Sequence, residues 1–121
     1  MRTNVDHKAI RMSVIKLVQD DTAPDIDVTL IDQSTGEPFD VSHAEDVVRF
    51  HFKKLGELVP KATIICSKIN GGADGAVRIE WGTSDLDTPG NYEGEIEISL
   101  NTGKITSVYN VLRFLVRKRV G

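Results

Sequence analysis

The stretch Val-Val-Arg-Phe-His-Phe-Lys-Lys, residues 47–54, alternates apolar and polar side chains. Val48, Phe50 and Phe52 share one face, and the positions between them are charged or carry an imidazole. Because successive side chains of a β-strand point to opposite faces, this alternation predicts a half-buried strand. The two phenylalanines are expected to supply much of the core beneath it.

Further short runs, alternating or rich in β-branched residues, lie on both sides of this strand and are separated by Gly-, Asn-, Asp- and Pro-containing turns. Seven to eight strands at a spacing of roughly ten residues indicate an all-β sandwich rather than alternating strands and helices. The last run is either one long strand or two short strands broken near 109–110. The other expected strands lie in residues 12–18, 25–32, 61–69, 75–81, 91–100 and 104–120.

The segment Pro-Gly-Asn-Tyr-Glu-Gly, residues 89–94, favours an immunoglobulin-like sandwich over a closed barrel. Tyr92 stands just inside a strand, two residues after a glycine and after an acidic loop, as in a tyrosine corner. A plain core aromatic is the alternative interpretation of Tyr92. Gly94 stands where antibody domains carry their second cysteine, so an apolar core is expected. The sequence thus predicts an immunoglobulin-like antiparallel β-sandwich.

The chain of 121 residues and 13.4 kDa fits one domain, expected over residues 12–121. Residues 1–11 show no period and are expected to form an extended N-terminal arm. The single cysteine, Cys66, excludes an intramolecular disulfide framework. Because the sequence shows no signal-peptide pattern and no apolar run near the ~18 residues of a membrane span, we expect synthesis in a cytoplasm and no membrane contact.

The net charge of −3 divides unevenly along the chain. Residues 1–97 hold all eighteen acidic residues and ten basic ones, whereas residues 98–121 hold five basic residues and no acid. The body therefore has a net charge of −8 and the C-terminal segment one of +5. Because nucleic-acid binding needs a basic face, it is not expected of so acidic a body.

The residue types that carry catalysis and metal binding do not form known motifs. His7, His43 and His51 are scattered and Cys66 has no partner cysteine, so no metal or cofactor site is expected. The chain lacks the Gly-x-Ser-x-Gly pattern of a serine nucleophile, and the Gly-Lys pair at 103–104 lacks the upstream glycine of a phosphate-binding loop. We therefore predict that the protein is not an enzyme and has no catalytic residue, cofactor or small-molecule substrate.

Two groups of aspartates stand near predicted strand ends. Carboxylates from both groups would suit calcium if the loops met at one end of the sandwich. A solvated acidic edge is the other interpretation, and it is favoured because no spacing matches a dedicated calcium loop. The aspartates are Asp20, Asp21, Asp25 and Asp27 in the first group and Asp85 and Asp87 in the second.

Three glutamates, Glu93, Glu95 and Glu97, fall on one face of a predicted strand. Such close like charges repel one another unless cations lie opposite, and the last strand offers arginines of one parity at 113, 117 and 119. In an unbroken hairpin Leu100 pairs with Lys104, and the last arginines extend beyond the partner strand. A break at 109–110 allows direct pairing of glutamates with arginines.

If the C-terminal cations do extend beyond their partner, they are expected to contact an acidic surface on a neighbouring subunit. The N-terminal arm is a second candidate contact, because termini without a period often become ordered only against a partner. The predicted subunit interface comprises Arg113, Arg117, Lys118, Arg119, Glu93, Glu95 and Glu97.

The order and spacing of several turn-and-strand phrases across residues 20–105 resemble a known family. The phrases are Asp-Thr-Ala-Pro at 21–24, Gly-Glu-Pro-Phe-Asp-Val-Ser at 36–42, Val-Arg-Phe at 48–50, Gly-Ala-Val-Arg-Ile-Glu-Trp at 75–81, Asp85, Pro-Gly-Asn-Tyr-Glu at 89–93 and Gly-Lys at 103–104. This series resembles the N-terminal domain of phage baseplate upper proteins and related small immunoglobulin-like virion modules of tailed phages. The resemblance implies a domain that docks onto the baseplate or onto a neighbouring virion ring.

The expected function is therefore that of a noncatalytic structural component of a tailed-phage virion, first of all a tail or baseplate adaptor. Its partners would be other virion structural proteins and copies of itself, and it would be made in the host bacterial cytoplasm. A neck, head-tail or capsid-decoration protein is an alternative. A free-standing carbohydrate-binding or adhesion module is another, for which Tyr109 is the main candidate for stacking on a sugar.

Overall fold

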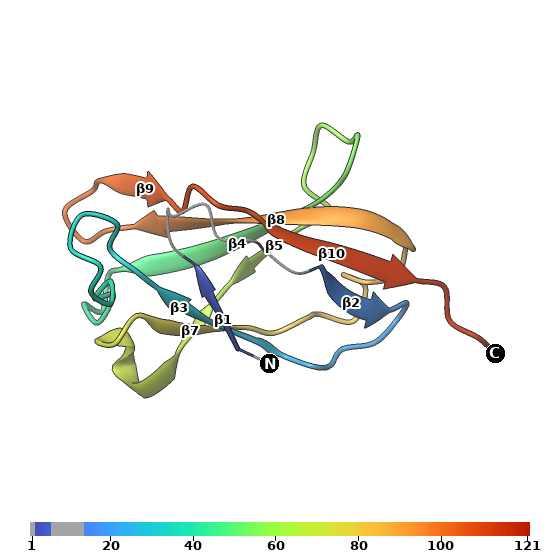
Figure 1. Ribbon diagram of the computed structural model, residues 1–121, viewed down its shortest axis with the longest axis horizontal. Coiled ribbons are helices and arrows are strands. Elements are labelled where there is room, and N and C mark those ends of the chain that lie inside the picture. Colours follow the sequence, from blue (N-terminus) through green and yellow to red (C-terminus); the bar gives the residue numbers. More distant parts are fainter. Residues whose placement is uncertain (1, 6–13) are drawn as a thin grey trace.

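In the computed structural model, which describes residues 2–5 and 14–121, two β-sheets pack face to face (Figure 1). The predicted all-β sandwich is thereby confirmed. The only helical turn of the described residues is a short 3-10 helix, Ile69–Gly72. The strands are β1 (Arg2–Val5), β2 (Ile15–Val18), β3 (Ile26–Leu30), β4 (Val47–Lys54), β5 (Ala62–Ile65), β6 (Ser67–Lys68), β7 (Ala76–Ile79), β8 (Gly90–Ser99), β9 (Ile105–Ser107) and β10 (Leu112–Arg117).

The strand order is that of an immunoglobulin-like sandwich. One sheet runs β1-β3-β7-β6, and the other runs β2-β10-β8-β4-β5 with β9 paired to β8. The first contains the strands usually called B, E and D, and the second contains C, F and G. The pairs β1–β3 and β2–β10 are parallel, so the prediction of antiparallel pairing holds for the centre of the sandwich and not for these two edges. Parallel neighbours cannot be joined by a hairpin and need a longer crossover connection. Both edge strands, β1 and β2, come earlier in the sequence than the strands with which they pair.

The predicted strand over 61–69 divides at Cys66. Its first part, β5, pairs with β4, whereas its second part, β6, pairs with β7 in the opposite sheet. The Cys66 side chain is buried, and its backbone N–H donates to the carbonyl oxygen of Val48 at 2.8 Å. The chain therefore changes sheets at this residue, which is one reason why the described residues hold more strands than the sequence predicts.

The core between the sheets is an aromatic cluster in which Phe50 and Phe52 are fully buried, as predicted. The ring of Phe52 stacks on that of Tyr92 with 4.3 Å between centroids, and Trp81 meets Phe52 edge-on at 5.0 Å. Phe114 lies edge-on to both phenylalanines, at 5.4 Å from Phe52 and 5.7 Å from Phe50. Such tilted and stacked pairs are favourable beyond the area they bury, so the cluster ties β4, β8 and β10 together.

The hydroxyl of Tyr92 donates a hydrogen bond to the carbonyl oxygen of Thr88, at 2.5 Å and four residues upstream. This bond is the mark of a tyrosine corner, and the prediction is confirmed. Burial raises the pKa of the Tyr92 hydroxyl. The indole N–H of Trp81 similarly donates to the carbonyl oxygen of Pro24 at 3.1 Å. Both polar aromatics thus enter the core with their polar atoms satisfied.

Gly94 lies at the middle of β8, under the ring of Phe50. A Cβ at this position would stand 2.1 Å from Cε1 of Phe50, 2.3 Å from Cζ of Phe50 and 3.1 Å from Cε1 of Phe114. Both rings are fully buried and packed on other rings, so neither can move aside cheaply. The aromatic cluster therefore requires glycine at this position.

We expect the substitution Gly94→Ala to lower the free energy of unfolding by about 3 kcal/mol, the upper part of the range for overpacked cores. The measurement is urea denaturation followed by tryptophan fluorescence, since Trp81 belongs to the cluster. Glu95→Ala is the control, because Glu95 is exposed and its loss should change stability by no more than about 0.5 kcal/mol. Equal stability of the two variants would contradict this account of the core.

Candidate functional site

The segment that joins β8 to β10 contains the predicted break. The N–H of Leu100 donates to the carbonyl oxygen of Lys104 at 2.8 Å, as the hairpin prediction requires. Between β9 and β10 the register moves by two residues at 109–110, so that Glu93 lies opposite Arg113. Because side chains alternate with a period of two, this even shift leaves the arginines of β10 on the outer face.

The row of glutamates on β8 is balanced mainly by β4 rather than by the arginines of β10. Glu93 lies 3.6 Å from the ammonium of Lys53, and Glu97 lies 3.4 Å from Nε2 of His51. His51 is also the register partner of Glu95. These contacts form a cross-strand ladder within the domain, in which each exposed pair is worth roughly 0.2–1 kcal/mol.

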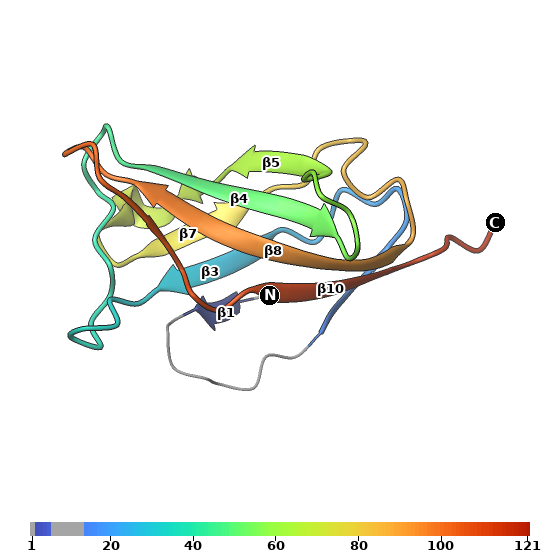
Figure 2. The same ribbon diagram turned by 90° about the horizontal axis from the view of Figure 1, so that it is seen from above.

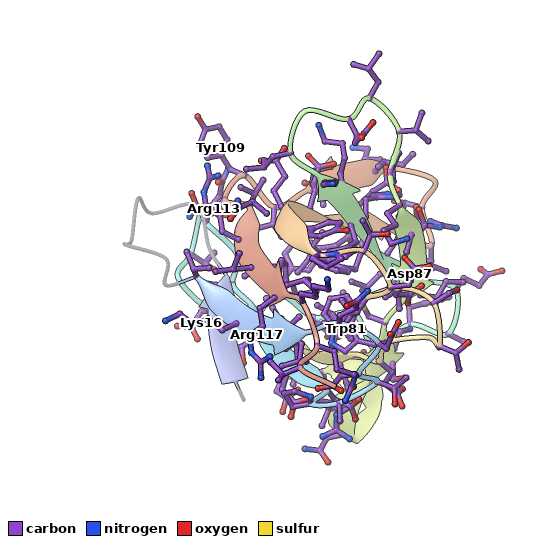
Figure 3. All side chains as sticks on the ribbon, turned by 90° about the vertical axis from the view of Figure 1, so that its right-hand side faces the viewer. Lys16, Trp81, Asp87, Tyr109, Arg113 and Arg117 are labelled. Atoms are coloured by element: carbon purple, nitrogen blue, oxygen red, sulfur yellow. The ribbon has the colours of Figure 1, made fainter. Side chains whose placement is uncertain are left out.

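Four cations on and beside β10 form what we call the basic stripe: Lys16, Arg113, Arg117 and Lys118. Arg113 and Arg117 are exposed and alternate with buried residues of β10, about 13 Å apart at 3.3 Å per residue. None of the four forms an ion pair with an acid among residues 2–5 and 14–121. Figure 3 shows Lys16, Arg113 and Arg117 on the β2–β10 side of the sandwich, away from Asp87.

Lys16 joins the stripe because β2 pairs in parallel with β10, with Lys16 opposite Leu115. Sequence reasoning missed this residue. The alternation over 12–18 already places Lys16 on an outer face, but periodicity within one strand cannot name the neighbouring strand. Leu115, 38% exposed, gives the stripe an apolar centre.

Arg119, a predicted interface residue, has partners within its own chain. Its guanidinium forms an ion pair with Asp21, and its Nε donates to the carbonyl oxygen of Gln19 at 3.1 Å. Its backbone N–H donates to the side chain of Gln19 at 3.2 Å. These contacts fasten the C-terminal segment to the turn after β2. Arg117, by contrast, lies beyond Val116, the last residue of β10 that pairs with β8.

Of the six aspartates weighed above as calcium ligands, Asp21, Asp27 and Asp87 form ion pairs with cations of this chain. Asp27 accepts two hydrogen bonds from Arg78, at 2.7 and 3.1 Å, and Asp87 lies 2.6 Å from the ammonium of Lys61. The hydrogen bond from Lys61 lowers the pKa of Asp87, and the hydrogen bond that Arg78 donates to Asp27 raises the pKa of Arg78. Across the described part of the chain, no three His, Cys, Asp or Glu side chains converge on a point that a metal ion could occupy.

The described histidines and the cysteine have structural surroundings. His51 contacts Thr63 at 3.1 Å besides Glu97, and Nδ1 of His43 accepts the N–H of Glu45 at 3.1 Å within a turn. His7 lies outside the described residues. Burial raises the pKa of the Cys66 thiol to about 12, so the sulfur stays protonated at neutral pH and is a poor nucleophile.

A pocket of about 250 Å³ opens at one end of the sandwich, between the segment after β3 and the segment around β9. We call it the end pocket. Leu30, Phe39, Ile98 and Val108 contribute apolar side chains to its lining, and Tyr109 stands beside it with 83% of its surface exposed.

The strand order, the tyrosine corner and the charged outer face define an immunoglobulin-like β-sandwich with an exposed basic edge. In this class, function lies in the surface and loops rather than in the shared scaffold. No helix among the described residues has the length and apolar character to span a membrane.

Comparison with known proteins gives one informative result. No family model matches the chain, and no curated protein matches it. Among solved structures, it is similar to the N-terminal domain of phage TP901-1 ORF48, with a TM-score of 0.65 over 98% of this chain and 100% of that one. The sequence identity is 12%, so the similarity is one of fold.

Because the folded protein keeps the Cys66 thiol protonated, we expect the protein to lose stability in alkali. In the unfolded chain this thiol ionises near pH 9, whereas in the folded protein its pKa is about 12. The contribution of this thiol to the free energy of unfolding is therefore fully present below pH 9 and declines as the pH rises towards 12. Between pH 8 and pH 10.5 we expect a decrease of about 2 kcal/mol in the free energy of unfolding. In Cys66→Ala this part of the decrease should vanish, and an unchanged pH profile would contradict the assignment.

Proposed function

We propose that this protein is a noncatalytic structural component of a tailed-bacteriophage virion, acting as a tail or baseplate adaptor that docks to neighbouring subunits. The single observation that carries the proposal is the similarity of fold, over nearly the whole of both chains, to a phage domain. The resemblance of sequence phrases over residues 20–105 to baseplate upper proteins supports the same conclusion independently.

The basic stripe is the docking surface of this proposal. Its cations lack acidic partners in the described structure, whereas two of the three predicted interface glutamates, Glu93 and Glu97, already have partners on β4. The acidic surface that Arg113 and Arg117 meet therefore belongs to the neighbouring subunit. Complementary charge of this kind sets orientation and raises association rates, and Leu115 adds apolar contact at the centre.

The side chains that could take part in catalysis have structural surroundings, which supports a noncatalytic function. The Cys66 thiol is a buried core group, and His51 contacts Glu97 on the outer face. Asp27 and Asp87 form ion pairs with Arg78 and Lys61. His51 lines a pocket with Lys53, Glu93 and Glu95, and Cys66, Asp27 and Asp87 are not part of that pocket.

The double substitution Arg113→Glu/Arg117→Glu should remove the protein from virions. Two positive charges at the stripe become negative, a net change of four charge units, so its attraction to an acidic neighbour becomes repulsion. The measurement is the amount of the protein, by quantitative mass spectrometry, in particles purified from a phage that carries the variant; we expect a decrease of tenfold or more, roughly 1.4 kcal/mol per factor of ten. Arg119 is left intact because it fastens the chain to Asp21.

Lys104→Glu is the matched control for that experiment. Lys104 is exposed in the turn between β8 and β9 and lies outside the stripe, so its reversal should leave incorporation unchanged. Equal incorporation of the double variant would exclude the stripe as the docking surface. Absence of the wild-type protein from virions would exclude the function itself. Immunogold labelling of the same particles separates a tail or baseplate position from the neck, head-tail or capsid alternatives.

A carbohydrate-binding module is the second candidate, favoured by the exposed ring of Tyr109 beside Gln33 and Ser34 of the end pocket. Exposed aromatic rings stack on sugars, and nearby polar side chains orient them. Binding on a glycan array that is lost in Tyr109→Ala, with incorporation into virions absent, would favour this candidate. Under the structural proposal the array should show no binding.

A further inference from the structure

The strand β5 forms an open edge of the larger sheet. It pairs on one side with β4, and no described strand pairs with its other side. Figure 2 shows β5 at the border of the sheet, with β4 between it and β8. An edge strand presents a row of unpaired backbone N–H and C=O groups, so it can serve as a template for a further strand.

The register identifies the backbone groups of β5 that face away from β4. The N–H of Cys66 donates to the carbonyl oxygen of Val48 at 2.8 Å, so these two residues form a hydrogen-bonded pair. Because such pairs alternate along an antiparallel ladder, Ile64 belongs to the next one, and the N–H and C=O groups of Thr63 and Ile65 point to the open side. Among the described residues, no loop or turn forms a backbone hydrogen bond with Thr63 or Ile65.

The other edges of the two sheets differ from β5 in charge or length. Natural edge strands are commonly kept from further pairing by a charged side chain or by being very short. β1 begins with Arg2, β2 contains Lys16, β6 has two residues of which one is Lys68, and β9 has three residues. β5, by contrast, has four residues, Ala62–Ile65, without charge, proline or glycine. Its edge is therefore open to pairing.

Both faces of β5 hold an apolar side chain that is incompletely covered. Ile65 lies on the outer face and is 68% exposed. Ile64 points to the core and is only partly buried against it. β-Branched side chains pack well against those of a neighbouring strand. A further strand beside β5 would thus cover apolar surface on both faces while it satisfies the backbone groups between them.

A second copy of β5 fits this short edge. The edge ends at the loop 55–61 on one side and on the other at Cys66, where the chain crosses to the opposite sheet. In an antiparallel pair centred on Ile64, Thr63 of each copy lies opposite Ile65 of the other, so all the open N–H and C=O groups of both copies are paired. A centre one residue to either side would leave some of them open. Because neither strand is charged, no like charges stand directly opposite.

We propose that two copies of this chain pair through β5 in antiparallel orientation, about a two-fold axis at Ile64. The two Ile64 side chains meet on the inner face, because side chains approach most closely in pairs without hydrogen bonds. On the outer face Ile65 packs beside Thr63 of the other copy. The contact joins the larger sheets of the two copies into one continuous sheet, and it closes at two copies because it uses the same surface on both.

This contact goes beyond the proposed function, because it uses neither the basic stripe nor a second kind of protein. Two strands of four residues bury less surface than a standard interface, so the dimer should be weak in dilute solution. Docking that holds copies side by side would raise the effective concentration of the β5 edges. The test therefore uses the purified full-length chain at high concentration.

Sedimentation equilibrium between about 10 μM and about 1 mM should show a monomer–dimer equilibrium. Ile65→Lys should weaken it tenfold or more, because it removes apolar contact and places a charge on the edge strand. Ile105→Lys is the matched control, since Ile105 is 64% exposed and begins β9, another edge strand of the same sheet; it should leave dimerisation unchanged. Arg113→Glu/Arg117→Glu should also leave it unchanged, so failure of this contact and failure of the basic stripe are distinguishable.

Disulfide trapping tests the register. One variant carries Thr63→Cys and another carries Ile65→Cys; in the proposed pair their Cα atoms lie about 5.5 Å apart, a distance that a disulfide spans. Under mild oxidation the mixture should form a covalent dimer of one chain of each kind, at least tenfold in excess of the dimers formed by either variant alone. Cys66 is buried in both. Thr106→Cys, exposed on β9, replaces Thr63→Cys in the control mixture and should yield only the background amount.

Three results would overturn the proposal. A chain that sediments as a monomer over the whole concentration range does not pair through β5. Equal weakening by Ile65→Lys and Ile105→Lys, with circular dichroism showing both variants folded, would assign self-association to another surface. An excess of homodimers from Thr63→Cys or Ile65→Cys alone would show a register that is not centred on Ile64.

Discussion

The close approach of the Phe50 ring to the backbone of Gly94 is the contact on which the rest of the structure depends. It allows β8 to lie between β4 and β10 while Phe50 and Phe114 meet across it, with 5.7 Å between ring centroids. A methyl group at Gly94 would separate these rings, and Phe52, which packs on Phe114, would lose contact as well. The position of β10, and with it the outer face that carries the basic stripe, therefore follows from the absence of one side chain.

The break at 109–110 acts on the same strand in a different way. Two inserted residues shift β10 along β8 without turning it over, so Phe114 stays in the core and Arg113 stays in water. An insertion of one residue would exchange these faces and bury the arginines. The loop at the break also projects Tyr109 beside the end pocket, so a single irregularity sets both the register of the stripe and one wall of the pocket.

Strands in which apolar and polar side chains alternate could be predicted from the sequence, because burial of one face requires apolar residues at every second position within the strand itself. Phe50, Phe52 and Tyr92 are buried as expected, and the corner hydrogen bond of Tyr92 follows from its local context. The sheet change at Cys66 and the parallel partner of Lys16 could not be predicted, since strand pairing is decided by distant residues. The partner of Arg119 within its own chain could not be predicted for the same reason, since Asp21 lies in a turn that tertiary packing alone brings near.

The fold pairs some of the unevenly distributed charges of the chain and leaves others without an ion-pair partner. Five ion pairs engage Asp21, Asp27, Asp87, Glu93 and Glu97, whereas segment 31–46 and the basic stripe form no ion pair among the described residues. Separated charges of opposite sign orient a molecule as it approaches its neighbours, whereas desolvated apolar contacts slow its departure. A domain that works through its neighbours needs both properties, because orientation alone gives brief encounters and apolar contact alone gives poor specificity.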